Sequence, residues 1–266
     1  MPFLYLYASV LADLVAAWWD DPDYSHGFLV PLLTAYFVWE RRPALIDMVP
    51  QTSRCGLGVL LTGLCMLFVG TIGAEFFIMR LSMIVVIGGL VLYLLGWHYL
   101  WTLSFPIAFL LFMIPLPALI LNVVTFPLQL LAAKLSTFAL QLVEFPVFRE
   151  GNIIFLPHIT LEIVEACSGL RSLMSLMALS VVFGYLTQRA FWKRLVLGAS
   201  SVPIALLANA FRIWGTGVLA YFWGSKAAEG FYHTFAGWSV FAVAFVLLLV
   251  EGFVLLALGS VRRIRR

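Results

Sequence analysis

The sequence predicts an all-α polytopic membrane protein, with about eight transmembrane helices, an outer-face amphipathic or re-entrant helix and a small β-hairpin cap. First, 63% of its residues are hydrophobic and only 11% are charged, whereas about a quarter of the residues in a soluble domain are charged. Second, the apolar residues form runs of about 20, the length that crosses a bilayer as a helix. Third, the basic residues cluster beside these runs, as at Arg41 and Arg42, which favours a topological role and argues against nucleic-acid binding.

The expected spans belong to a single integral membrane domain, residues 1–266. Their approximate ranges are 3–19, 25–39, 56–73, 77–96, 98–114, 168–187, 193–222 and 234–258. Lys and Arg are enriched in cytoplasmic loops, and a cytoplasmic N-terminus places ten of the sixteen basic residues on that side. The sequence therefore predicts a multi-pass topology with both termini cytoplasmic.

Residues 115–166 are expected to form an insertion on the outer face. Its first part is apolar but is broken by Pro115, Pro117 and Pro127, and proline removes a helical hydrogen bond. This pattern predicts a surface or re-entrant helix on the outer leaflet. The second part, "VFREGNIIF" followed by "ITLEIV", predicts two strands around a turn at Gly151 and a third strand.

The three cysteines, Cys55, Cys65 and Cys167, form no CxxC pair. This spacing supports neither a zinc site nor a dithiol redox relay, and it argues against a disulfide-generating oxidoreductase. We expect no metal and no cofactor. Cys65 is expected to serve packing.

Cys167 lies in "EACSGLRSL", beside Glu165 and at an expected helix start. A helix N-terminus stabilises a thiolate, and Arg171, four residues on, shares that helical face. Ser168 and the glycine after it leave the backbone uncrowded, so a substrate carbonyl could approach. The alternative is that Cys167 is a small buried hydrophobe, as free cysteines often are.

The stretch "ANAFRIWG" places Asn209 and Arg212 well inside the expected seventh span. An arginine at membrane depth is costly and is expected only where it has a partner or a wet cavity. One interpretation is a polar clamp between helices. The other is a guanidinium directed at a developing oxyanion or at a substrate peptide.

His233, in "EGFYHTFAGW", opens the expected eighth span on the outer side. Histidine is the usual acid–base partner of a thiol nucleophile, although a histidine at this depth also suits a lipid headgroup contact. His26, in "DYSHGFLV", competes with it at similar depth. The predicted topology brings Cys167, Arg212 and His233 toward one face, and such sites are defined by geometry rather than by chain order.

"EACSGLRSL", "NAFRI" and the following outer-face histidine, together with "YSHGFLVP" and "FPVFREGNIIFLP", resemble the exosortase/archaeosortase family of membrane transpeptidases over about residues 18–255. The resemblance implies a multi-spanning bacterial inner-membrane cysteine enzyme, and the predicted topology places its site on the periplasmic face. It implies that Cys167 is the nucleophile and that Arg212 and His233 complete the site. The implied substrates are membrane-anchored proteins with a C-terminal sorting tail, made of a Pro-Glu-Pro-like motif, a transmembrane helix and a basic cluster, and the implied acceptor is a sugar or lipid of the envelope.

Two alternatives stay open. A non-enzymatic exporter component would use Asn209 and Arg212 to line a solute path, and thiol blockers would leave its function intact. An intramembrane cysteine hydrolase would use the same residues as the transpeptidase, with water as the acceptor.

Overall fold

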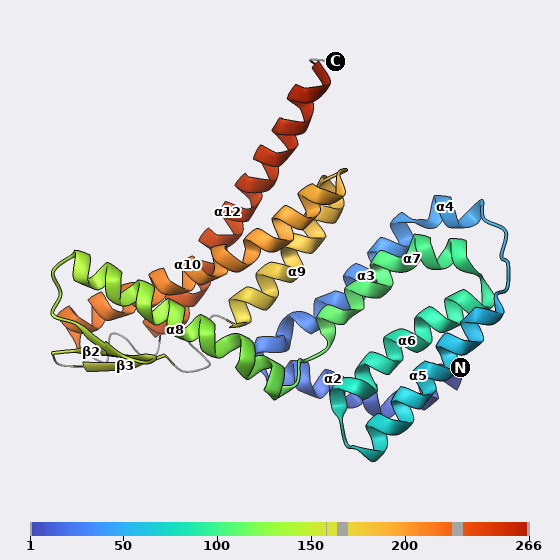
Figure 1. Ribbon diagram of the computed structural model, residues 1–266, viewed down its shortest axis with the longest axis horizontal. Helices are drawn as coiled ribbons and strands as arrows, with labels where there is room; N and C mark the ends of the chain where they lie inside the picture. The colour runs from blue at the N-terminus through green and yellow to red at the C-terminus, as the bar shows by residue number, and fades with distance from the viewer. Residues whose placement is uncertain (1, 158, 164–169, 225–230, 265–266) are drawn as a thin grey trace. The chain divides into compact units, whose positions relative to one another are not determined.

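The computed structural model describes residues 2–157, 159–163, 170–224 and 231–264. The chain divides into two compact units, Met1–Pro117 and Ala118–Arg266. Both units are built mainly from helices, and the second also holds a small sheet (Figure 1). This confirms the predicted helical class, while the assignment of residues 1–266 to a single membrane domain stays a prediction.

The first unit contains helices only in its described part. They are α1 (Pro2–Leu6), α2 (Ala8–Asp20), η1 (Pro22–Phe28), α3 (Leu29–Glu40), α4 (Arg42–Ile46), α5 (Arg54–Ile72), α6 (Phe76–Leu94), α7 (Trp97–Phe109) and η2 (Leu110–Met113).

Helices α5 and α6 form a tightly packed antiparallel hairpin, because glycines lie where the two helices meet. A Cβ at Gly63 of α5 would lie 2.6 Å from Val86 Cγ2, and one at Gly89 of α6 would lie 2.8 Å from the backbone nitrogen of Leu60. Lipid tails are as apolar as leucine, so helices in a membrane associate through such close van der Waals contact between small residues.

Five helices in the described residues are long and apolar enough to cross a membrane: Arg54–Ile72, Phe76–Leu94, Ala118–Leu142, Phe191–Trp223 and Gly237–Leu258. The predicted count of about eight is therefore not confirmed. Two further predicted spans correspond to the shorter apolar helices Trp97–Met113 and Arg171–Thr187. The predicted span 25–39 is shorter still: α3 has 12 residues and rises about 18 Å, against a hydrocarbon core of about 30 Å.

The described part of the second unit holds four long helices and a three-stranded sheet. In chain order they are α8 (Ala118–Leu142), β1 (Phe148–Glu150), β2 (Ile153–Leu156), β3 (Ile159–Glu162), α9 (Leu170–Thr187), α10 (Phe191–Trp223) and α12 (Phe231–Ile264).

The sheet is antiparallel with the order β1-β2-β3, which confirms the predicted strands. Phe148 pairs with Phe155 across β1 and β2, and Ile154 pairs with Leu161 across β2 and β3. One face packs on the helices: Ile154 joins Ala132 of α8 and Ile213 of α10 in a buried core cluster. The strands thus cover one side of the α8–α10 pair.

Residues 118–142 differ from the predicted re-entrant element. They form one continuous helix, α8, with Pro127 inside it. A proline inside a helix removes one backbone hydrogen bond, yet α8 continues on both sides of Pro127, and its buried face runs past the proline from Thr125 to Gln129 and Ala132. The prediction that this helix lies on the outer leaflet stays a prediction.

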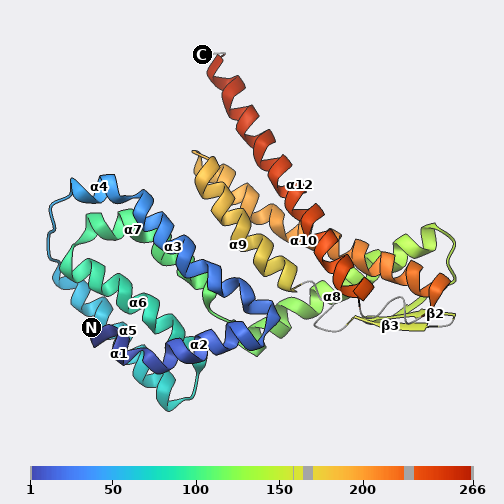
Figure 2. The same ribbon diagram turned by 180° about the vertical axis from the view of Figure 1, so that it is seen from behind.

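Helices α9, α10 and α12 share a second core, and Figures 1 and 2 both show α9 alongside α10. Leu176, Leu197 and Leu248, one from each helix, are fully buried in it. Polar groups join the helices near the α9–α10 loop: Gln188 Nε2 donates to the carbonyl of Gly252 (2.9 Å), and Lys193 Nζ donates to the carbonyl of Leu255.

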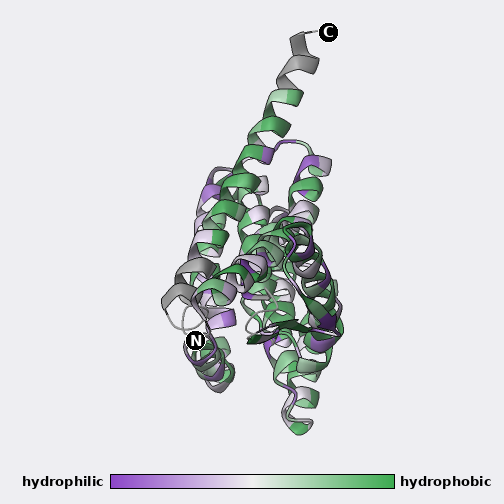
Figure 3. Ribbon diagram, turned by 90° about the vertical axis from the view of Figure 1, so that its left-hand side faces the viewer, coloured by the Kyte–Doolittle hydropathy of each residue, from purple (hydrophilic) through white to green (hydrophobic). Residues whose placement is uncertain are grey.

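Large apolar side chains cover the outside of both units. Phe68 of α5 is 66% exposed and Phe253 of α12 is 59% exposed, and Figure 3 shows hydrophobic residues along most of the helices. Soluble monomers rarely expose contiguous apolar patches of this kind. Exposed apolar side chains of this kind fit contact with lipid tails, as expected for a membrane protein.

Candidate active site

Helix α9 begins at Leu170 and carries Arg171 in its first turn, with an exposed side chain. Three of the predicted site residues, Glu165, Cys167 and Ser168, lie outside the described residues. In the sequence, Cys167 precedes the first residue of α9 by three positions. Its role as nucleophile stays a prediction.

Helix α10 places Asn209 and Arg212 on a long continuous scaffold. Arg212 lies about 17 Å before the end of the helix at Trp223, at 1.5 Å per residue. The Asn209 side chain is 4% exposed and that of Arg212 is half-buried. Neither side chain is without an interaction partner, as expected for polar groups at membrane depth.

Neighbouring α8 fixes this part of α10. The hydroxyl of Ser136 lies 2.8 Å from the carbonyl of Ala210, next to Asn209, and both Ser136 and Ala210 are buried. Sequence reasoning missed Ser136, because a serine in an apolar helix commonly bonds only to its own backbone. Its reach to a second helix depends on the packing of α8 against α10.

The guanidinium of Arg212 lies against α12 at Gly237. A Cβ built at Gly237 would lie 3.5 Å from Arg212 Nη1. His233 lies in α12 four residues before Gly237, and residues four apart share one face of a helix. The backbone position of His233 is therefore one turn from the point where Arg212 meets α12.

Three contacts give the register between α10 and α12. Lys193 meets Leu255, Ser200 Oγ lies 2.6 Å from Glu251 Oε2, and Arg212 meets Gly237. In these contacts the residue number rises along α10 as it falls along α12, so the two helices run antiparallel. One turn further on, the position of His233 falls opposite that of Thr216.

The register between α9 and α10 shows which part of α10 lies beside the start of α9. A Cβ at Gly184 would lie 3.5 Å from the Cα of Arg194, and the guanidinium of Arg194 stacks on Tyr185 at 5.2 Å. Leu170 lies fourteen residues before Gly184, and Ala208 lies fourteen residues after Arg194. Because the helices are antiparallel, α9 begins level with Ala208, beside Asn209.

His26 lies in the first unit, on η1, and is half-buried. Its Nε2 is 3.1 Å from the carbonyl oxygen of Phe112. Because a carbonyl only accepts hydrogen bonds, Nε2 carries the proton in the neutral ring and Nδ1 keeps the lone pair. His26 therefore helps to hold η1 on η2, a structural contact that the sequence did not predict.

The other two cysteines lie on α5, and both are exposed. For Cys65 this corrects the expectation that it serves packing: the helix turns Gly56, Gly63 and Gly70 inward instead. Within the described residues, no group of three or more His, Cys, Asp or Glu side chains is placed to hold a metal ion.

The arrangement in the second unit thus brings three elements together along about 12 Å of α10, between Ala208 and Thr216. They are the start of α9, the Asn209–Arg212 segment of α10 and the first turns of α12. A cation at this place is suited to stabilise negative charge that develops on a bound carbonyl.

Comparison with known proteins identifies the family. No curated protein matches the sequence, and no solved structure matches it. The sequence model of the transmembrane exosortases matches residues 18–250, which include α9, α10 and the first part of α12. The chain belongs to the transmembrane exosortase family.

Proposed function

We propose that this protein is a membrane-embedded cysteine transpeptidase that removes the C-terminal sorting tail of membrane-anchored proteins and transfers the shortened protein to an envelope acceptor. One observation carries the proposal: the start of α9, the guanidinium of Arg212 and the helix turn of His233 all lie along about 12 Å of α10, between Ala208 and Thr216. Family membership supports the same reaction class.

In the first half of the proposed reaction, the thiolate of Cys167 attacks the carbonyl carbon of the scissile peptide bond. A C–S bond forms and the carbonyl oxygen becomes an oxyanion, which accepts hydrogen bonds from Arg212. The C–N bond then breaks, the leaving nitrogen takes a proton from His233, and the upstream protein is held as a thioester.

In the second half, a hydroxyl or amine of the acceptor attacks the thioester carbon and gives its proton to His233. The C–S bond breaks and the thiolate is restored. A sugar or lipid acceptor makes the enzyme a transpeptidase, whereas water makes it a hydrolase. Asn209, Arg171, Glu165 and Ser168 are proposed to support substrate binding around the nucleophile, and His26 is the competing histidine.

We place the site on the periplasmic face of the inner membrane, with both termini cytoplasmic. The substrate's own helix would then lie in the bilayer beside the enzyme, with its basic cluster on the cytoplasmic side. This arrangement follows from the distribution of Lys and Arg along the sequence.

The test is substitution of Cys167, followed by tail removal from a reporter protein. Cys167→Ala should abolish cleavage and should also abolish a hydroxylamine-sensitive adduct between enzyme and substrate, because a thioester requires the thiol. Cys55→Ala and Cys65→Ala are the matched controls, since both cysteines are exposed on α5, and they should cleave normally. Full cleavage by folded Cys167→Ala would show that Cys167 is not the nucleophile.

A further inference from the structure

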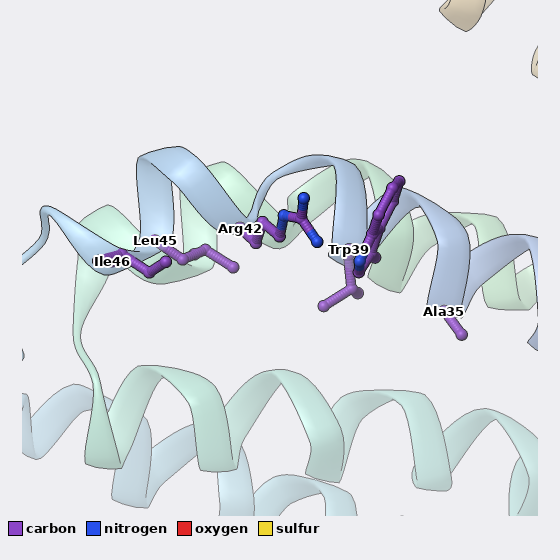
Figure 4. Close-up of a pocket in the computed structure, with 6 residues that line it drawn as sticks. Ala35, Trp39, Arg42, Leu45 and Ile46 are labelled. Carbon is purple, nitrogen blue, oxygen red and sulfur yellow. The ribbon is translucent and has the colours of Figure 1, made fainter.

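An open groove in the first unit lies where α3 meets α4. It has a volume of about 550 Å³ and is lined by Ala35, Val38, Trp39, Arg42, Leu45 and Ile46. Figure 4 shows Arg42 reaching toward Trp39, with Leu45 and Ile46 on the α4 side and Ala35 on the α3 side. The lining is therefore apolar apart from one cation.

The cation has a defined position. The guanidinium carbon of Arg42 lies 4.2 Å from the centroid of the Trp39 ring. A guanidinium carries five N–H donors, and a cation–π contact with a single ring engages only one side of the group. Arg42 can therefore keep the Trp39 contact and still donate hydrogen bonds to a ligand.

The groove is also held by the rest of the unit. The hydroxyl of Tyr99, on α7, lies 3.1 Å from the carbonyl oxygen of Leu45 and 2.9 Å from that of Met48. These contacts fix α4 and the segment after it, so the bend between α3 and α4 is a built feature.

Chemistry points to one class of ligand. Helix α3 exposes apolar side chains such as Leu32 (68%) and ends at the charged residues Glu40 and Arg41, so the groove lies at the boundary between hydrocarbon and water. Tryptophan is enriched at that boundary, and basic pockets beside apolar helices bind anionic lipid headgroups. Arginine matches a phosphate group with two parallel hydrogen bonds.

We propose that this groove binds an anionic glycerophospholipid, with its phosphate on Arg42 and an acyl chain along Ala35, Val38 and Leu45. The groove contains none of the residues proposed for catalysis, and it lies wholly within the first unit. Its occupant is a lipid of the surrounding bilayer rather than free phosphate, because five of the six lining residues are apolar.

The experiment is native mass spectrometry of the purified full-length protein with phosphatidylglycerol or phosphatidylcholine of identical chains. The wild type should bind phosphatidylglycerol about tenfold more tightly than phosphatidylcholine. Inorganic phosphate should not compete with phosphatidylglycerol. Arg42→Gln should lose the preference. Ala35→Trp, which fills the groove without changing charge, should weaken the binding of phosphatidylglycerol.

Arg54→Gln is the matched control, because Arg54 is an exposed arginine of the same unit that does not line the groove. It should keep the preference for phosphatidylglycerol. An unchanged preference in Arg42→Gln, or an equal loss in Arg54→Gln, would overturn the proposal. Elution of each variant as a single folded species separates loss of the site from loss of the fold.

Discussion

The α5–α6 and α10–α12 pairs are both antiparallel and both have glycine at the contact, but the glycines accommodate different groups. In α5–α6, Gly89 admits backbone: a Cβ built there would lie 2.8 Å from the backbone nitrogen of Leu60. In α10–α12, a Cβ built at Gly237 would lie 3.5 Å from Nη1 of Arg212. One glycine allows helices to touch, and the other leaves room for a charge.

The two pairs thus separate glycines that allow close helix packing from a glycine beside the arginine to which the proposed function assigns chemistry. Close backbone packing holds α5 and α6 together without polar groups at the glycine contacts. In α10–α12, hydrogen bonds from Lys193 and Ser200 tie the helices near the α9–α10 loop. The opposite end holds Arg212, to which the proposed function assigns the oxyanion.

The largest effect is expected from Gly89→Ala, which should break the first pair. Its Cβ would meet the backbone of Leu60 at 2.8–2.9 Å, and backbone cannot move aside as a side chain can. We expect destabilisation of about 2–3 kcal/mol, measured as unfolding in detergent.

The adjacent glycine supplies the control. A Cβ at Gly88 would lie 3.9 Å from Leu100 Cδ1, an ordinary contact. Alanine is a better helix former than glycine by roughly 0.5–1 kcal/mol, so Gly88→Ala should be neutral or slightly stabilising. Equal stability of the two variants would contradict the packing argument.

A second prediction concerns Arg212→Lys in the α10–α12 pair. If Arg212 stabilises an oxyanion with two oriented N–H donors, lysine cannot replace it, because lysine is a point charge without the planar fork. Turnover should fall about 10²-fold while membrane insertion stays normal. The measurement is the rate of tail removal per unit of folded, membrane-extracted enzyme.

A polar clamp between helices predicts the opposite pattern. Arg212→Lys would then keep most of its activity, and Arg212→Ala would fail through loss of folded protein. Near-normal rates for the lysine variant would remove Arg212 from the catalytic set.

The helical class, the three strands and the ends of α9 and α10 follow from sequence patterns, because apolar periodicity and turn residues are local signals. Arg212 could be singled out for a similar reason, since a charge in an apolar span is conspicuous. The contact of Arg212 with Gly237 could not be predicted from the sequence, because it depends on the register of two helices. The continuity of α8 through Pro127 could not be predicted either, because a proline usually breaks a helix.

The predicted span count is not confirmed, for a related physical reason. Hydropathy identifies apolar segments, but it does not say how many residues stay in one helix. Within predicted span 3–19 the helix is interrupted at Tyr7, and within 25–39 a 3₁₀ segment precedes the 12-residue α3. Both regions are apolar, yet neither is one helix of spanning length.

Gly237→Leu is expected to have the smallest effect, and it tests the comparison most directly. A Cβ alone would make an ordinary contact with Arg212 Nη1, so Gly237→Ala should be nearly silent. The outer atoms of leucine would enter the space of the guanidinium and displace it. Small misplacements of catalytic groups are costly, so the tail-removal rate should fall about tenfold with no loss of folded protein. Gly215→Leu is the control, because a Cβ there meets nothing within 4 Å in the described structure. If Gly237→Leu lowered stability as Gly89→Ala does, the glycine on α12 would serve helix packing and the two pairs would be built alike.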